Sequence, residues 1–240
     1  MRMNSSSVIM IRNAILIYLL GSILLVIVFM LYIAGYVINQ SQSYYINLEK
    51  PFYVIITLNS LLAVAVAVLE YTGFRRLSEL KGTYRFGAYG AILQLISLPF
   101  SITGAIYYIQ SIENTYKVSN ISGFTMQALL VKVNSLTYLG TAGSLINLIG
   151  WLLVFAILHK LGSDHGNGIV KTGSLAAIIG LALAISVTSY VPVAYTSYNA
   201  INVASVLILF TLLIIGGLIA FIGIIMLLIG LTSLAKVITH

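Results

Sequence analysis

The chain contains no cysteine and very little charge. Without cysteine it can form no disulfide, no thiolate metal site and no iron–sulfur cluster, and it has no thiol nucleophile. Charged residues make up 7% of the 240 residues, against about 25% in soluble domains, so there is too little polar material to cover a water-facing surface. Five acidic residues and three histidines leave general acid–base catalysis with few participants. These scarcities favour an integral membrane protein that is not an enzyme.

Apolar runs dominate what is present, since 60% of the residues are hydrophobic. A helix needs about 20 mostly apolar residues to cross a membrane. Six stretches meet this length, at about residues 8–38, 53–71, 87–109, 137–158, 173–193 and 200–234. We therefore predict an all-α, multi-pass membrane protein whose single domain, residues 1–240, is a bundle of six transmembrane helices. Two like-oriented helical hairpins would be flanked by a long first and a long last helix.

Two further helical features follow from the order of residues. The first apolar run is longer than the roughly 7–15 residues of a signal-peptide core, so we expect a retained first span. Residues 126–136 place apolar side chains at three- and four-residue spacing, which predicts a helix in the membrane interface or an outward extension of the fourth span. No glycine or proline interrupts this segment, which favours the extension.

Basic and aromatic residues indicate the orientation. Cytoplasmic segments carry an excess of Lys and Arg, and aromatic rings gather at the membrane boundary. With the N-terminus inside, nine basic residues fall inside and three outside: Arg2, Arg12, Arg75, Arg76, Lys81, Arg85, Lys160, Lys171 and Lys236, against Lys50, Lys117 and Lys132. Twelve of the tyrosines fall at or near the outer face. We expect a cell-membrane location with both termini cytoplasmic, and no nucleic-acid partner, because orientation accounts for the net charge of +7.

Two connectors between spans resemble each other. Phe74–Gly90 and Leu158–Gly173 share an apolar–basic start, and a shift of 84 residues aligns Gly82 with Gly166. Both hairpins would run in the same direction, which distinguishes them from the inverted repeats of many transporters. We predict an internal repeat of residues 54–110 and 138–193.

A family resemblance rests on these connectors and the helices after them. The stretches LHKLGSDHGNGIVKTGSLAAIIG and FRRLSELKGTYRFGAYGAILQLI resemble those of uncharacterised archaeal multi-spanning membrane proteins, over about residues 54–185. The composition, rich in Ile, Tyr and Ser, would suit a thermophilic or acidophilic archaeon. The resemblance implies a lineage and no particular activity.

Few residues are candidates for a ligand site. The first connector carries Arg75, Arg76, Lys81 and Arg85, which either contact anionic lipid or a partner protein or only anchor the loop. His159, Asp164 and His165 in the second connector lack metal-site spacing, and no span holds an interior histidine, so no metal or cofactor is expected.

Polar residues within the spans have two interpretations. Asn59, Gln94 and Asn147 either line a narrow polar path or hydrogen-bond between helices. Glu70 is the acidic residue that falls inside a span. Its position near the cytoplasmic end predicts that it reaches lipid headgroups or Arg75, which makes a role as a proton relay less favoured.

Small residues recur along the last span. Gly216, Ala220, Gly223 and Gly230 form a seam that lets a helix approach closely, either from the same chain or from another protein. With no catalytic arrangement present, the leading prediction is a non-enzymatic scaffold or accessory subunit of a membrane complex. Its partners would be membrane lipids and either other membrane subunits or a second copy. The alternative is a channel or transporter for a small solute or ion.

Overall fold

The protein is a bundle of long helices. The computed structural model describes residues 5–39, 49–119, 126–196 and 203–239. Within them lie six α-helices and one short 3-10 helix: α1 (Ser5–Asn39), α2 (Glu49–Ser78), η1 (Gly82–Tyr84), α3 (Arg85–Ser119), α4 (Met126–Asp164), α5 (Gly168–Thr196) and α6 (Val203–Thr239). Five of the described helices are long and apolar enough to cross a membrane, and α5 has a shorter apolar segment at Gly168–Leu183. The predicted all-α, multi-pass membrane architecture is therefore confirmed.

The helices extend beyond the apolar runs that predict them. In lipid every backbone N–H and C=O needs an internal partner, and a continuous helix supplies one at each residue. The helix α4 begins at Met126, so the prediction that residues 126–136 extend the fourth span is confirmed. The fifth span, expected at about residues 173–193, corresponds to α5, which is longer at both ends (Gly168–Thr196).

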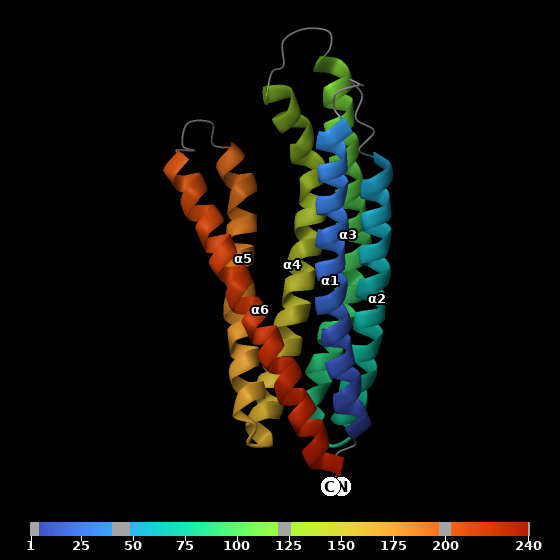
Figure 1. Ribbon diagram of the computed structural model, residues 1–240, viewed down its shortest axis with the longest axis vertical. Helices are drawn as coiled ribbons and strands as arrows, with labels where there is room; N and C mark the ends of the chain where they lie inside the picture. Colours follow the sequence, from blue (N-terminus) through green and yellow to red (C-terminus); the bar gives the residue numbers. More distant parts are fainter. Residues whose placement is uncertain (1–4, 40–48, 120–125, 197–202, 240) are drawn as a thin grey trace.

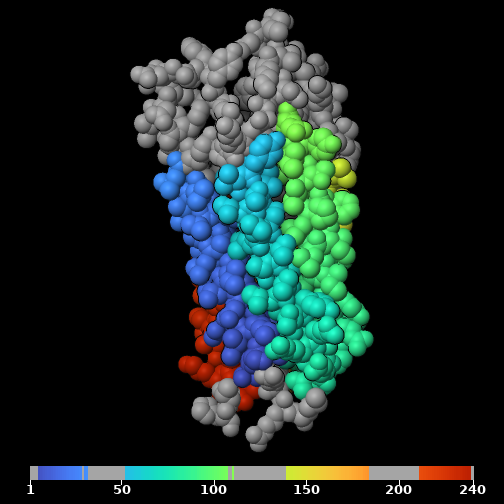
Figure 2. All heavy atoms as spheres, turned by 90° about the vertical axis from the view of Figure 1, so that its right-hand side faces the viewer, coloured from blue at the N-terminus to red at the C-terminus, as the bar shows by residue number. Residues whose placement is uncertain are grey.

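Both connectors lie at one end of the bundle, which we call the connector end (Figure 1). Here α1 begins, α6 ends, and α2 and α4 pass into η1 and α5. Away from this end, α5 and α6 diverge from α1–α4 (Figure 1). On the face shown in Figure 2, α2 lies between α1 and α3, and α6 emerges beside α1 near the connector end.

The buried core is concentrated at the connector end. The largest fully buried apolar side chains come from four helices, namely Ile11, Ile15, Phe74, Leu77, Leu158, Leu161, Leu227 and Leu231. In α1, burial stops at Ile15, and no described side chain beyond it is fully buried. The helices therefore converge around the connectors, and their far portions expose apolar side chains such as Leu24, Leu31 and Leu218, as expected for a surface that faces lipid.

The small-residue seam of α6 packs against α5 of the same chain. A Cβ added at Gly223 would lie 2.5 Å from Ala177 N and 2.7 Å from Gly173 O. A Cβ at Gly180 would lie 2.5 Å from Gly216 O, and one at Gly230 would lie 2.8 Å from the backbone N of Val170. These are largely backbone contacts, so the two helices touch where only glycine or a small residue fits.

A second glycine-lined interface joins α3 and α4. A Cβ at Gly90 would lie 2.6 Å from Gly150 O, and one at Gly143 would lie 2.7 Å from Ser101 N. The pairs α3–α4 and α5–α6 are thus the closely packed ones. The predicted repeat pairs the helices differently. Its units are α2 with α3 and α4 with α5, and in each unit a connector joins the two helices.

Candidate functional site

Glu70 and Gln94 form a buried polar pair between α2 and α3. Gln94 Nε2 donates a hydrogen bond to Glu70 Oε2 at 3.0 Å, with Glu70 0% and Gln94 5% exposed. The other carboxyl oxygen, Oε1, is buried and has no hydrogen-bond partner among the described residues. Buried polar atoms without a partner are uncommon and costly, so this oxygen calls for an explanation.

The position of Gln94 depends on the close approach of α3 and α4. A Cβ on Gly150 would lie 2.9 Å from Gln94 Cγ and 2.7 Å from Gly90 O, so the absence of side chains at Gly90 and Gly150 makes room for the amide. Ser97, also buried, donates through its hydroxyl to the Gln94 backbone carbonyl at 2.6 Å. The amide is therefore held between two tightly packed helices and presented to α2.

Aromatic rings from α1 and α4 pack in the same core. The rings of Tyr18 and Trp151 have centroids 4.6 Å apart, and Trp151 stacks on Phe155 at 5.3 Å. Tyr18 lies within electrostatic range of Glu70. In the described part of the chain, the carboxyl has one amide donor and no basic side chain bonded to it.

The predicted surroundings of Glu70 are wrong. It does not reach headgroups or Arg75, because its side chain is enclosed and Gln94 is its partner, while Arg75 is exposed. Glu70 lies eight residues before the end of α2, about 12 Å along the helix axis. An ionisable group enclosed within a membrane-spanning bundle is by default a candidate functional residue.

The three residues of the predicted polar path lie in different environments. Gln94 belongs to the buried pair, Asn147 on α4 is half-buried, and Asn59 on α2 is exposed. Two serines near them bond within their own helices, since the Ser60 and Ser144 hydroxyls each donate to the carbonyl four residues earlier. Of the three predicted residues, Gln94 is the one that the structure places in a buried polar contact with a neighbouring helix.

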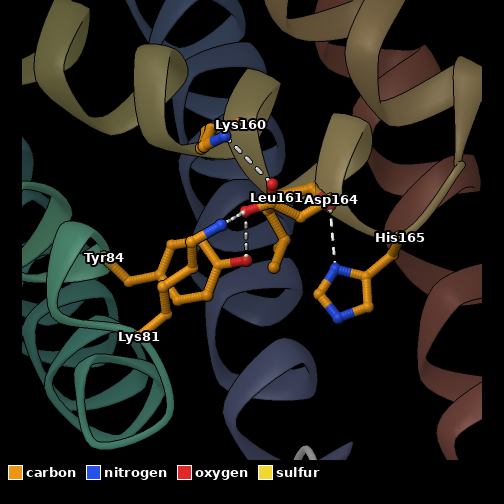
Figure 3. A network of polar contacts seen from close by, with 6 residues as sticks. All are labelled: Lys81, Tyr84, Lys160, Leu161, Asp164 and His165. Carbon is orange, nitrogen blue, oxygen red and sulfur yellow. Dashed lines mark hydrogen bonds and ion pairs between the residues drawn. The ribbon is translucent and has the colours of Figure 1, made fainter.

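A charged cluster joins the two connectors at the surface. Lys81 Nζ lies 2.7 Å from Asp164 Oδ2, and the Tyr84 hydroxyl donates to the same oxygen at 2.9 Å. Lys160 Nζ, one turn before Asp164 on α4, lies 3.0 Å from Oδ1. Figure 3 shows Lys81 and Tyr84 approaching Asp164 from one connector and Lys160 from the helix that leads into the other. We call these four residues the Asp164 clamp.

The other basic residues of the first connector face outward. Arg75, Arg76 and Arg85 are exposed, and Arg76 Nη1 makes a 3.5 Å contact with the Ser6 hydroxyl. Lys81 is half-exposed and engaged by Asp164. The predicted contact residues for lipid or a partner are thus on the surface, with Lys81 also serving an intramolecular role.

The second connector is a compact turn between two helices. Gly166 has φ +65°, and the backbone N–H groups of Gly166 and Asn167 donate to the carbonyls of Ser163 and Gly162, which ends α4 in a Schellman motif. Asn167 then caps α5, since its Oδ1 accepts from Val170 N at 3.0 Å. Its Nδ2 donates to Gly230 O at 3.1 Å, which ties the turn to α6.

The histidines of this connector bond to nearby backbone. His159 Nδ1 lies 3.1 Å from Lys171 O, and His165 Nδ1 lies 3.0 Å from Leu161 O. The described residues include no group of three or more His, Asp or Glu placed to hold a metal ion. Hydrogen bonds to nearby backbone carbonyl groups therefore account for the positions of both histidine side chains.

Several important residues were not singled out from sequence. Asn167 stands directly before a helix start, which is a recognisable capping signal. Gly143 and Gly150 repeat the seven-residue spacing that marks the seam of α6, and this signal predicts a second tight interface. The pairing of Glu70 with Gln94 leaves no such trace, because it depends on how two helices rotate against each other.

The fold and the buried pair define a multi-pass α-helical membrane protein that encloses one carboxyl–amide pair. Comparison of the chain with protein-family models, with curated proteins and with solved structures finds no match. The function is therefore inferred from the residues themselves.

Proposed function

We propose that the protein moves a small cation across the membrane, with Glu70 as the binding residue and Gln94 as its support. The observation that carries this proposal is the enclosed carboxyl group of Glu70, which has one amide donor and one oxygen without a partner. Ionisable residues in this setting mark ion pathways and proton relays in membrane proteins. A purely structural role would be served equally well by an apolar side chain.

The internal use of the glycine seam supports transport over the scaffold role. The seam was one reason to expect a docked partner, and it is covered by α5 of the same chain.

Flux into proteoliposomes tests the proposal. Vesicles containing a pH-sensitive dye report proton movement, and radioactive sodium and rubidium report the other monovalent cations. We expect flux with the wild-type protein and at least a tenfold loss with Glu70→Gln, because the variant keeps the size of the side chain and lacks the charge. Gln94→Leu should also reduce flux.

Asn59→Leu is the matched control for Gln94→Leu. It removes an amide from an exposed position on α2, so its flux should match that of the wild-type protein. If the wild-type protein carries none of these cations, or if Glu70→Gln carries them at the wild-type rate, the proposal is refuted.

The second candidate is an accessory subunit or scaffold of a membrane complex. Beyond the connector end, α6 diverges from α1, and both expose apolar side chains, including Leu20, Leu24, Leu218 and Ile222, each more than half exposed. A helix of a partner subunit could pack there in place of lipid. Purification in mild detergent tests this role, since a stable second protein in constant ratio would support it and a monomer without one would count against it.

We also propose that the connector end faces the cytoplasm and contacts anionic headgroups. Exposed Arg75, Arg76 and Arg85 at this end support both statements, because such residues are retained inside and attract acidic lipid. The absence of native cysteine permits a direct test with Gly82→Cys, a position where an added Cβ meets nothing within 4 Å. In intact cells this cysteine should resist a membrane-impermeant maleimide and react after the membrane is opened.

A further inference from the structure

Two buried polar atoms without a hydrogen-bond partner lie on adjacent helices. They are Glu70 Oε1 on α2 and Ser7 Oγ on α1, and each has less than 1 Å² of exposed surface. The two helices approach closely at Gly73, where an added Cβ would lie 3.0 Å from Ser7 O and 2.6 Å from Ile11 Cγ1. Glu70 is one helical turn from Gly73. Ser7 therefore lies on the part of α1 that packs against α2 within one turn of Glu70.

We infer that Glu70 binds a single proton and exchanges it with the aqueous phase at the connector end through Ser7. On binding, an O–H bond forms at Glu70 Oε1 and one O–H bond of hydronium breaks, which leaves a water molecule; release is the reverse step. The Ser7 hydroxyl can accept and donate a hydrogen bond, so with water it can relay the proton. This inference names the cation of the proposed function, and its exchange step can be tested apart from transport.

The chemistry of the pair favours a proton over a metal cation. Gln94 directs its N–H toward the carboxyl, and an N–H group cannot ligate a cation. Cations such as Ca²⁺ require about 6–8 oxygen ligands, whereas the described residues offer no cluster of acidic or histidine side chains at this position. A proton needs only the one free carboxyl oxygen.

The neighbouring helices place few titratable or charged groups near Glu70. From α1 the titratable side chain within electrostatic range is Tyr18, and α3 presents the neutral Gln94. Arg12 on α1 bonds Asn13 at 2.8 Å, and the Tyr84 hydroxyl in η1 bonds Asp164. In the described part of the chain, the carboxyl therefore titrates without a bonded basic partner.

Ser7 lies nearer the connector end than Glu70, because it meets α2 at Gly73, one turn closer to that end. Ser7 is the third residue of α1, and its neighbour Ser6 contacts exposed Arg76 at the surface. Ser7 itself is enclosed, with 1% of its surface exposed, and it directly follows the residue that makes this surface contact.

Infrared difference spectroscopy of the protein in lipid nanodiscs tests the inference. The chain has only five acidic side chains, so the carbonyl stretching band of one protonated carboxyl group can be assigned by its loss in Glu70→Gln. We expect that band to appear and disappear reversibly with bulk pH. We also expect it to shift on transfer to D₂O, at a rate at least tenfold lower in Ser7→Val. Ser7→Thr, which retains the hydroxyl, should restore the rate.

Ser174→Val is the matched control, because Ser174 is equally buried and its hydroxyl is bonded within α5 at 2.6 Å. It should leave the exchange rate unchanged, and circular dichroism should show that every variant is folded. The inference fails if no band depends on both Glu70 and pH, or if Ser7→Val exchanges at the wild-type rate. Proton exchange without vesicle flux would refute the transport function and retain this site. Vesicle flux without proton exchange at Glu70 would refute this site and retain the transport function.

Discussion

Replacing Gly223 of α6 by alanine places a methyl group where α5 leaves no room. The added carbon would lie 2.5 Å from Ala177 N and 2.7 Å from Gly173 O, and both are backbone atoms that cannot rotate away. Ordinary van der Waals contact begins at 3.4 Å, so the helices would have to separate by about 0.9 Å at this point. A gap of ~0.5–1 Å already removes a quarter to a half of the attraction between packed atoms.

The expected magnitude follows from two opposing terms. Overpacking of a close interface costs about 1–3 kcal/mol, whereas alanine is a better helix former than glycine by about 0.8–1 kcal/mol. We therefore expect Gly223→Ala to lower the free energy of unfolding by up to about 2 kcal/mol. Packing is the main attraction between helices in lipid, so no hydrophobic term would offset this loss.

Gly217 supplies the control on the same helix. A Cβ at Gly217 meets nothing within 4 Å, so Gly217→Ala makes the identical chemical change without a clash. We expect it to raise the free energy of unfolding by up to about 1 kcal/mol, through helix propensity alone. The difference between the two variants isolates the contact of α6 with α5.

Steric trapping in bicelles measures the free energy of unfolding of each variant, and fluorescence of the single tryptophan, Trp151, follows the transition. Equal values for the two variants would refute the reasoning, as would a Gly223→Ala protein more stable than the wild type. Either result would mean that α5 and α6 do not pack along this seam.

Three further predictions concern other parts of the core and use the same unfolding assay. Phe74→Ala should cost about 3–5 kcal/mol because the ring is fully buried, while Phe86→Ala, at a half-exposed ring, should cost much less; similar losses would contradict this. Gln94→Leu should cost about 1–3 kcal/mol, because it removes the hydrogen-bond donor to Glu70. The same substitution should cost less when Glu70→Leu is already present, so equal costs in the two backgrounds would count against the Glu70–Gln94 pair. Asp164→Asn should cost about 1 kcal/mol or less because its lysine partners are nearly half exposed, and a loss that persists in molar salt would argue against an ionic clamp.

The helical architecture could be predicted from sequence because lipid leaves the backbone few alternatives. Apolar length alone identifies the helices, since a spanning segment must satisfy its own hydrogen bonds. The limits of the helices were less predictable: α5 passes through Pro192, because a proline does not end a helix that neighbouring groups support.

The surroundings of Glu70 could not be predicted in the same way. Its distance from the helix end can be counted in the sequence, but its burial depends on which side of α2 faces α3. Gln94 lies 24 residues away, and no periodic signal links the two. The partner of the α6 seam was equally undetermined, because small residues show that a helix comes close without showing which helix it is.

The charges of the first connector illustrate the same limit. Arg75, Arg76, Lys81 and Arg85 are equivalent in sequence as a basic cluster. In the structure Lys81 differs from the others because the second connector brings Asp164 to it across 83 residues of chain. Only the meeting of the two connectors shows that Lys81 has an acidic partner within the chain.

The contact between α1 and α6 has a consequence for biosynthesis. At the connector end the first helix packs against the last, so side chains such as Ile11 and Leu231 belong to one core. A nascent chain emerges with its N-terminal part first. During insertion α1 has α2 as a neighbour long before α6 exists, and part of its eventual packing surface must meanwhile face lipid or the insertion machinery. The ring of helices can close only after α6 enters the bilayer, so the core at the connector end is completed well after α1 is inserted.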